Sequence, residues 1–480
     1  MIKILFAASE AFPFIKTGGL ADVVGALPRA FPKFKYDVRV ILPKYACMDA
    51  KWTKDLKLKT HFMVHLGWRE QYAGILETKW EGVTYYFVDS EYYFGGDKPY
   101  NNLHEDLEKF AFFDKAVLQA MKAIDFQADI VHCHDWQAAL IPAYLKAEYQ
   151  KDSFYQSMKT IFTIHNIRYQ GRWGVNAVRD TTGLPQQFFT AQGLEHYGDA
   201  NYLKGGIAYA DKVTTVSRHY VQEICTQEGG EGLDGILRSR GNDLIGITNG
   251  IDYEIFNPKK DTDILKKYDI RNHKSGKRQN KAALQKEFSL PQKEEAFVIG
   301  MVSRMTDQKG WDLVIAVIDE ILRDSSIQFV ISGSGEERYT GFFHHLAWRY
   351  PEQVAVNTVY SEAVSHRIYA GCDAFLMPSM FEPCGLSQLI AMRYGTVPIV
   401  RETGGLKDTV VPYNEYEGTG TGFGFANYNA HEMMAAVRYA VIVFKNHRKE
   451  WDAMVKRCMK ENFSWESAAR KYEDLYQSLL

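Results

Sequence analysis

The sequence has few cysteines and none of the patterns that would give them a structural task. Only six of its 480 residues are cysteine, and no two of them form a C-x-x-C pair. The sequence therefore favours neither a disulfide framework nor a zinc ribbon, and it suits a reducing compartment. A chain of this length buries a core large enough to fold without such staples.

An excess of charge of one sign is also missing. Lysine and arginine total 57 against 59 acidic residues, a net charge of -2. Because binders of nucleic acid or membrane surfaces normally carry a basic excess, we expect neither as a partner. No run approaches the ~20 apolar residues that span a bilayer. The apolar opening, residues 2–9, is short and predicts a first buried strand rather than a signal peptide, so we expect a cytoplasmic protein.

Three nucleotide or metal signatures are incomplete or absent. There is no G-x-x-x-x-G-K-[ST] loop, which disfavours an ATPase. Gly333-Ser334-Gly335 begins like a dinucleotide fingerprint, but Arg338 stands in place of the third glycine, which disfavours a nicotinamide oxidoreductase. His132-Cys133-His134-Asp135 begins like a metallohydrolase cluster, but Trp136 follows instead of a further Asp-His pair. We therefore expect no metal and no cofactor.

The sequence contains many short runs rich in Val, Ile and Phe, separated by longer helical or irregular stretches. Most are continuously apolar rather than alternating, which is typical of strands covered on both faces by helices. Their alternation with helical segments predicts an α/β fold with mostly parallel sheets. The runs are 2–9, 37–42, 83–89, 129–134, 160–165, 212–217, 245–248, 296–303, 328–332, 354–360, 374–378 and 397–400.

The pattern lapses between Pro258 and Glu295, a lysine-rich stretch without a strand. We interpret it as a solvated linker or surface helix rather than a basic binding site. It separates parts of roughly 250 and 200 residues, which predicts two domains. The last stretch, residues 464–480, predicts an amphipathic helix with Ser464 as its N-cap. Its apolar face contains Trp465, Ala468, Ala469, Tyr472, Leu475 and Leu479.

One motif occurs in both halves of the chain. Thr17-Gly18-Gly19-Leu20-Ala21-Asp22-Val23-Val24 returns as Thr403-Gly404-Gly405-Leu406-Lys407-Asp408-Thr409-Val410, and each copy follows a strand and opens a predicted helix. Glycine pairs in that place permit close backbone approach and expose the amides of a helix N-terminus, which favour anions. The repeat predicts two similar domains, each with a glycine-rich loop.

Polar residues collect just after the predicted strands. Ligands of open parallel sheets bind at the carboxyl ends of strands, so these residues predict a shared ligand site. Lys16, Arg304 and Lys309 suit a phosphate or pyrophosphate. Glu382, His165 and Asn166 suit sugar hydroxyls, and Tyr360 suits either stacking on a base or a place in the core. The set is Lys16, His134, Asp135, Trp136, His165, Asn166, Asn249, Arg304, Tyr360, Glu382, Cys384 and Thr403.

These stretches, in their order along nearly the whole chain, resemble the ADP-glucose-dependent glycogen and starch synthase family of bacteria. The matching pieces are Lys16-Thr17-Gly18-Gly19-Leu20, His132–Trp136, Thr163-Ile164-His165-Asn166 with Tyr169-Gln170-Gly171, Asn249-Gly250-Ile251-Asp252, Ser303–Gly310, YSEAVSHR at 360–367, Glu382-Pro383-Cys384-Gly385-Leu386 and Thr403-Gly404-Gly405-Leu406.

The resemblance implies the GT-B glycosyltransferase fold. In that fold two Rossmann-like domains face an interdomain cleft, and a C-terminal helix crosses back to the first domain. The implied ranges are 1–255 for the acceptor-side domain, 256–460 for the donor-side domain and 461–480 for the helix. The implied reaction transfers glucose from ADP-glucose to the non-reducing end of an α-1,4-glucan such as glycogen, with retention and without a metal.

The resemblance also implies roles for individual residues. The catalytic group is Lys16, His165, Arg304, Lys309 and Glu382, of which Arg304 and Lys309 clamp the pyrophosphate and Glu382 binds glucose hydroxyls. Donor binding further involves Gly18, Gly19, Asp22, Asn249, Tyr360, Cys384, Gly385, Thr403, Gly404 and Gly405. Acceptor binding involves Asp135, Trp136 and Asn166.

Two alternatives stay open from the sequence. One is a related retaining transferase that uses a UDP-sugar or another acceptor. The other is a catalytically silent glucan-binding protein, although the presence of Lys16, Arg304, Lys309 and Glu382 favours an enzyme. Retention is compatible with a carboxylate nucleophile or with attack from the leaving-group face. We expect the latter, with the leaving diphosphate deprotonating the acceptor.

Overall fold

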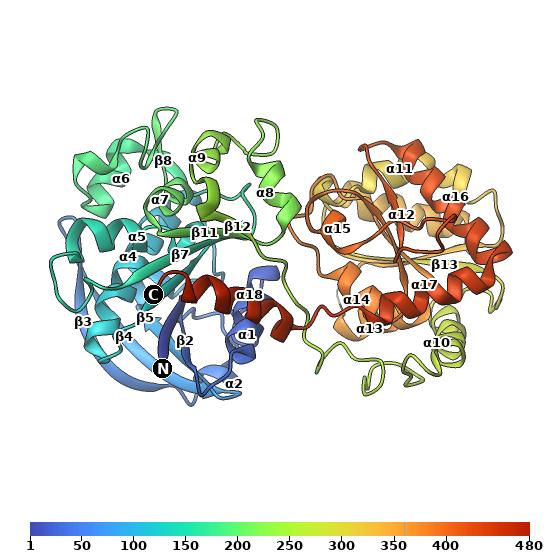
Figure 1. The fold of residues 1–480 in the computed structure, drawn as a ribbon, viewed down its shortest axis with the longest axis horizontal. Coiled ribbons are helices and arrows are strands. Elements are labelled where there is room, and N and C mark those ends of the chain that lie inside the picture. The colour runs from blue at the N-terminus through green and yellow to red at the C-terminus, as the bar shows by residue number, and fades with distance from the viewer. Residues whose placement is uncertain (360) are drawn as a thin grey trace. The chain divides into compact units, whose positions relative to one another are not determined.

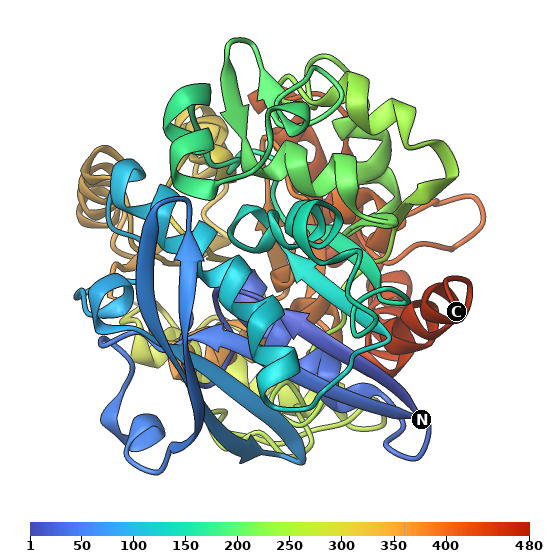
Figure 2. The same ribbon diagram turned by 90° about the vertical axis from the view of Figure 1, so that its left-hand side faces the viewer.

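The computed structural model describes residues 1–359 and 361–480, so the predicted base-stacking Tyr360 lies outside the described residues. The chain forms two compact units. Unit 1 comprises Met1–Asn249 and Trp465–Leu480, and unit 2 comprises Gly250–Ser464. These bounds differ by a few residues from the implied domain ranges 1–255, 256–460 and 461–480. Both termini lie in unit 1 (Figures 1 and 2). None of the helices in the described chain is long and apolar enough to cross a membrane.

Unit 1 is built on a nine-stranded sheet in the order β12-β11-β7-β6-β1-β2-β5-β4-β3, with helices on both faces (Figure 1). The chain runs outward from β1 to β2 on one side and outward from β6 to β7 on the other, so the order reverses between β1 and β6. The strands are β1 (Ile2–Ala7), β2 (Tyr36–Pro43), β3 (Lys57–Leu66), β4 (Arg69–Trp80), β5 (Val83–Asp89), β6 (Ile130–His134), β7 (Lys159–Ile164), β11 (Lys212–Thr215) and β12 (Leu244–Gly246).

A small second sheet of unit 1 contains β8 (Arg172–Gly174), β9 (Glu195–His196) and β10 (Asp199–Asn201). The helices of unit 1 are α1 (Gly19–Ala30), α2 (Ala50–Thr53), α3 (Glu91–Phe94), α4 (Leu103–Ala123), α5 (Ile141–Tyr144), α6 (Val175–Thr182), α7 (Tyr202–Tyr209), α8 (Arg218–Ile224), α9 (Asp234–Ser239) and α18 (Trp465–Gln477).

The antiparallel ribbon β3–β4 is absent from the strands expected from sequence. Its first strand reads KLKTHFMVHL, and most of its side chains are exposed or half-buried. Such a strand has no continuous apolar run, because it lies at the edge of the sheet and packs on one face only. A pattern of continuous apolar runs therefore does not predict this strand.

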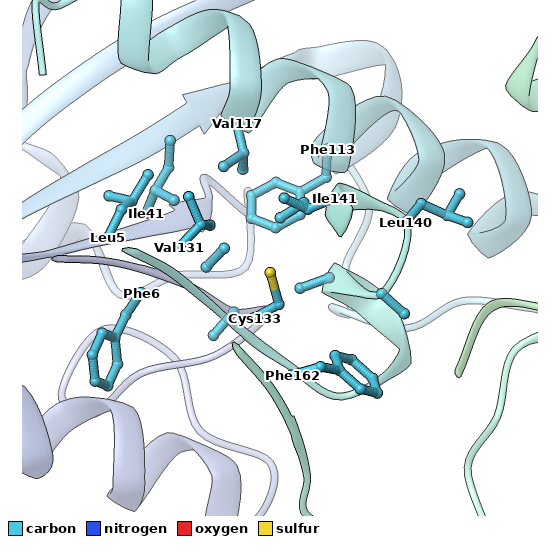
Figure 3. Close-up of a cluster of buried hydrophobic side chains, with 14 of the residues drawn as sticks. Leu5, Phe6, Ile41, Phe113, Val117, Val131, Cys133, Leu140, Ile141 and Phe162 are labelled. Carbon is cyan, nitrogen blue, oxygen red and sulfur yellow. The ribbon is translucent and has the colours of Figure 1, made fainter. Parts of the chain in front are cut away.

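The core of unit 1 fixes the ends of the central strands. Leu5 of β1 and Val131 of β6 pack with Phe113 and Val117 of α4 (Figure 3). Phe162 of β7 belongs to the same core, and all five side chains are fully buried. Burying each such side chain contributes about 1.5–3 kcal/mol. The strands are thereby held in register, and so are the loops that follow them.

The C-terminal helix α18 returns to unit 1, as the resemblance implies. It packs on α1, and the ring of Tyr476 lies 5.5 Å from that of Phe31. The apolar face predicted from sequence is buried at Trp465, Ala468, Ala469, Tyr472 and Leu475.

Unit 2 is built on a six-stranded parallel sheet in the order β15-β14-β13-β16-β17-β18, and its order reverses between β13 and β16. The strands are β13 (Phe297–Val302), β14 (Ile327–Ser332), β15 (Val354–Asn357), β16 (Ala374–Met377), β17 (Val397–Arg401) and β18 (Phe423–Phe425). The helices are α10 (His273–Glu287), α11 (Trp311–Ile321), α12 (Glu337–Arg349), α13 (Glu362–Gly371), α14 (Ser387–Arg393), α15 (Gly404–Thr409), α16 (Ala430–Asn446) and α17 (Arg448–Lys460).

Of the two expectations for the lysine-rich stretch, the surface helix is confirmed and the solvated linker is wrong, because the stretch forms helix α10 of unit 2. Its helix α10 packs on α13, and two of its lysines point inward. Lys281 pairs with Asp373 at 2.7 Å. Lys277 donates to Thr396 Oγ1 at 2.7 Å and to two backbone carbonyls, and burial lowers the pKa of its ammonium to about 8. These lysines bind the helix to the sheet, which a composition argument does not reveal.

Candidate active site

Most of the predicted site residues lie on loops at the carboxyl ends of strands at or next to the point where each sheet reverses its order, whereas Asn249 follows the edge strand β12 and Asp22 lies in α1. In unit 1 these loops follow β1, β6 and β7, and in unit 2 they follow β13, β16 and β17. Such reversal points leave a crevice between loops that run to opposite sides, which is where open parallel sheets bind ligands. Each unit therefore carries one group of candidate residues.

In unit 2 a lysine and a glutamate form the centre of the group. Lys309, in the short turn after β13, donates to Glu382 Oε2 at 2.7 Å, and Ser379 Oγ donates to the same oxygen at 3.0 Å. The side chains are 16% and 7% exposed, so the pair is shielded from bulk water. One cation and one carboxylate are thus held side by side, from strands adjacent in the sheet.

Arg304 lies on the same turn and stays exposed. Within the described part of the chain, its guanidinium has no carboxylate within salt-bridge distance, while its backbone oxygen accepts from the Trp311 indole at 3.0 Å. Gly310 closes the turn with φ 76°, and a Cβ there would lie 2.0 Å from the carbonyl oxygen of Pro378. The backbone of the turn is therefore fixed, and the guanidinium is available for an anion.

The glycines at the start of α15 pack closely against the loop that carries Glu382. A Cβ on Gly404 would lie 2.0 Å from the Glu382 carbonyl oxygen, and one on Gly405 would lie 2.1 Å from that of Cys384. The amide of Gly405 donates to the carbonyls of Glu382 and Pro383. This amide is thus occupied, contrary to the open amide cradle expected from sequence. The glycines and the buried Thr403 instead hold the Glu382 loop in place.

Cys384 and Gly385 belong to that same loop. Cys384 is 5% exposed, and Gly385 has φ 71° with Gln388 and Glu382 against it. The side-chain amide of Gln388 donates to the carbonyls of both residues. Their contribution to the site is therefore a rigid turn beside Glu382.

In unit 1 the first copy of the glycine motif differs from the second. Gly18 and Gly19 are exposed, and a Cβ on either would meet nothing within 4 Å. Lys16, just before them, pairs with Asp22 of α1 at 2.7 Å, with both side chains partly exposed. Packing within the protein does not require glycine at these two positions. The close approach of a ligand to the backbone would explain why they are glycine.

Glu10, which the sequence analysis did not single out, anchors this loop. It is 4% exposed and accepts from the backbone amide of Thr17, from Thr17 Oγ1 at 2.6 Å and from the Tyr100 hydroxyl at 2.5 Å. Its position three residues past β1, in line with the other polar residues after strands, was the signal available.

Asp135 organises the loop that follows β7. Its Oδ1 accepts from the backbone amide of His165 at 2.7 Å, and burial raises its pKa to about 7. Its own backbone has φ 56° and ψ -178°, a conformation almost restricted to glycine that costs about 1–3 kcal/mol. Strain of this kind persists only where surrounding contacts impose it, and it gathers at functional sites.

Three histidines pack behind this loop. His165 Nε2 lies 3.0 Å from His134 Nδ1, and the ring of His134 stacks on that of His132 at 4.3 Å. Burial lowers the pKa values of His132 and His165 to about 3 and that of His134 well below its ordinary value. All three are therefore neutral at physiological pH.

Three further predicted residues, Trp136, Asn166 and Asn249, show fewer features that point to a ligand. Trp136 is 8% exposed and packs against Phe110 and Trp173, so most of its indole is interior. Asn166 Oδ1 accepts from the Arg168 amide at 3.1 Å. Asn249, at the end of unit 1, is 7% exposed, and its Oδ1 has no hydrogen-bond partner among residues 1–359 and 361–480.

Two known protein families match most of the chain, one in each unit. The family described as "Starch synthase catalytic domain" matches residues 3–239, and the family described as "Glycosyl transferases group 1" matches residues 284–453. The glycogen synthase of Lachnospira eligens is 58% identical over 479 residues, covering 100% of each chain. That of Lachnoclostridium phytofermentans is 53% identical, again over 100% of each chain.

Solved structures give the same relationship. The catalytic domain of starch synthase IV from Arabidopsis thaliana, bound to ADP and acarbose, superposes with a TM-score of 0.91 at 32% identity. The match covers 100% of this chain and 99% of that one. A sucrose-phosphate synthase from Thermosynechococcus elongatus, with a TM-score of 0.63 and 15% identity, shares the fold.

Proposed function

This chain belongs to the glycogen synthase family and is a glycosyltransferase, and from that premise we propose its donor, acceptor and stereochemistry. It takes glucose from ADP-glucose, transfers it to the non-reducing end of an α-1,4-glucan with retention of configuration, and releases ADP. ADP in the related Arabidopsis starch synthase IV structure supports adenine as the base of the donor.

The observation that carries the proposal is the Lys309–Glu382 pair beside the exposed Arg304. A sugar nucleotide combines a diphosphate, which needs cations, with a hexose, which needs directional acceptors for its hydroxyls. Lys309 and Arg304 supply the former, and the Glu382 carboxylate supplies the latter within 2.7 Å of the lysine. Both kinds of group are thus held where the sugar–phosphate bond would lie.

Negative charge develops on the diphosphate as the sugar bond breaks, and fixed cations stabilise it without reorganisation. Lys309 and Arg304 take this role. We assign the acceptor proton to the leaving diphosphate, because Asp135 is already committed to the His165 amide and Glu382 to Lys309 and Ser379. A trapped glucosyl ester on Glu382 or Asp135 would contradict this front-face mechanism.

In unit 1 we assign Lys16, Gly18, Gly19 and Asp22 to the donor. The space beside the two glycines is open, and Glu10 holds their loop through its hydrogen bond with Thr17. His165 lies next to the reacting carbon, and Asn166, Asp135 and Trp136 shape the acceptor side. In unit 2 we assign Cys384, Gly385, Thr403, Gly404 and Gly405 to the donor pocket, where they hold Glu382. Asn249 and Tyr360 complete the donor set.

The proposal places the enzyme in the cytoplasm, which the six free cysteines support. Its partners are then ADP-glucose and glycogen or another α-1,4-glucan, with neither nucleic acid nor membrane. The test is to incubate the purified protein with glycogen and either ADP-glucose or UDP-glucose, and to measure release of each nucleoside diphosphate. Rapid ADP release that depends on glycogen supports the proposal. Preference for UDP-glucose would reject the donor, and silence with both would favour another sugar nucleotide or a glucan-binding protein.

A further inference from the structure

Within the described residues His134 makes one side-chain hydrogen bond, and it goes to a residue of the proposed site. Its Nδ1 lies 3.0 Å from His165 Nε2. The side chain is fully buried, and its other ring nitrogen, Nε2, has no hydrogen-bond partner in the described part of the chain. His134 ends β6, and His165 follows β7, its neighbour in the sheet.

Two neutral imidazoles that share one hydrogen bond must divide their protons in one of two ways. Either His134 carries its proton on Nδ1 and donates to His165, or His165 carries its proton on Nε2 and donates to His134. In the first arrangement the buried Nε2 of His134 is unprotonated and carries a lone pair. In the second it is an N–H group without an acceptor, and buried side-chain polar groups in folded proteins normally have a hydrogen-bond partner.

The ring of His134 is packed against two neighbouring rings. Its ring is stacked on His132 with an angle of 26° and is 5.1 Å from the ring of Phe6. His132 is itself committed, with Nδ1 2.9 Å from the Tyr476 hydroxyl and Nε2 2.6 Å from Thr163 Oγ1. The ring that faces His165 is thus held by a chain of contacts that begins on α18.

We propose that His134 is a positioning residue that donates its Nδ1 proton to His165 Nε2 and thereby fixes His165 as the tautomer protonated on Nδ1. His165 then presents a hydrogen-bond donor to the ligand. It accepts no proton, because one ring nitrogen is already accepting and the other already carries a hydrogen. Asp135 fixes the backbone of the same residue, so His165 is clamped at both its amide and its ring.

This inference rests on the proposed function for the role of His165 beside the ligand. It also explains why neither His134 nor His165 would act as the base. A neutral Nδ1–H group suits a sugar oxygen or a diphosphate oxygen as acceptor. The acceptor proton must then leave by another route, which is the diphosphate in the proposed mechanism.

The direct test is nuclear magnetic resonance of the protein labelled with ¹⁵N in histidine, without any substrate. His165→Gln and His134→Asn assign the two sets of ring signals. We expect His165 to show a protonated Nδ1 and an unprotonated Nε2, and His134 to show the same pattern. A protonated Nε2 on His165 would overturn the proposal. Because no substrate is used, this failure is distinct from a failure of the proposed reaction.

A second test uses turnover. His134→Asn keeps an N–H donor near the place of Nδ1, whereas His134→Leu removes it. Losing the hydrogen-bond partner that orients a metal-binding histidine costs on the order of 10- to 100-fold in activity, and we take the same range for the partner of His165. We expect that loss in kcat for His134→Leu, with KM for the sugar nucleotide nearly unchanged, and substantial rescue by His134→Asn. Wild-type kcat in His134→Leu, or equal losses in both variants, would overturn the positioning role.

His132→Leu is the matched control for the second test. It removes a buried histidine from the same stack, yet the hydrogen bonds it breaks go to Tyr476 and Thr163 rather than to His165. We expect lower thermal stability with kcat reduced less than in His134→Leu. A loss of kcat as large as that of His134→Leu would assign the effect to packing and overturn the proposal.

Discussion

At the scale of single residues, the two cations of unit 2 differ in what they do for the fold. Lys309 neutralises the buried Glu382 carboxylate, whereas Arg304 is exposed and has no carboxylate partner among the described residues. Breaking a buried pair leaves an uncompensated charge, while removing an exposed cation costs the fold little. Substituting Lys309 and Arg304 in turn therefore distinguishes an effect on turnover from an effect on the free energy of unfolding.

We predict that Arg304→Ala and Lys309→Ala both lower turnover, on the order of 10²- to 10³-fold, the usual cost of losing one group that stabilises developing charge. Only Lys309→Ala should also lower the free energy of unfolding, by up to about 3 kcal/mol. Steady-state kinetics and denaturant unfolding of both variants measure this. Near-normal turnover in Arg304→Ala would remove that residue from the diphosphate site.

The Asp135 carboxyl gives a pH dependence of known sign. Its pKa is about 7 in the folded protein against an ordinary value of 3.8, chiefly because of burial. The folded chain thus holds a proton that the unfolded chain releases. This contribution to stability is complete below pH 3.8 and is lost as the pH rises to about 7.

Asp135→Asn removes this dependence while keeping an oxygen for the His165 amide. We predict that the variant gains stability relative to the wild type as the pH rises from 4 to 7, and that the difference is constant above 7. One pKa unit corresponds to about 1.4 kcal/mol, so the change should exceed that amount. Urea unfolding at several pH values measures it, and a difference independent of pH would contradict the account.

At the scale of elements, the two copies of the glycine motif have the same sequence signal but different physical reasons. At the start of α15 the glycines admit the backbone of the Glu382 loop, whereas before α1 they face open space. The repeated motif therefore predicted two loops correctly. It did not predict that only the second loop has protein backbone packed against its glycines.

We predict that Gly405→Ala lowers the free energy of unfolding by about 1–3 kcal/mol, because the new Cβ meets the Cys384 backbone. Gly19→Ala, the matched change in the first copy, should leave stability nearly unchanged and raise KM for the sugar nucleotide. Thermal unfolding and kinetics of the two variants distinguish these effects. Equal destabilisation by both would show that the first loop also packs against protein.

The sequence predicted the buried strands well because parallel strands between helix layers are continuously apolar. It missed β3 and β4, whose exposed faces break that pattern. It predicted the residues that follow strands, but not that Glu10 holds the Thr17 loop or that Lys277 and Lys281 turn inward. Partners of this kind depend on which segments meet in space, and spacing along the chain does not encode that.

At the scale of the whole molecule, each unit places its polar residues at the reversal point of its own sheet. Unit 2 supplies cations and a carboxylate, and unit 1 supplies an open glycine loop and a clamped histidine. Neither group alone holds everything that transfer between a sugar nucleotide and a glucan requires. We propose that the chain as a whole performs this transfer with retention.

The most direct measurement uses ADP-glucose labelled with ¹³C at the anomeric carbon, incubated with a maltooligosaccharide and followed by carbon nuclear magnetic resonance. We predict a new signal from an α-1,4 linkage, growing in step with ADP release. A β-linked product, release of labelled free glucose in place of a linkage, or equal incorporation from UDP-glucose would contradict the account.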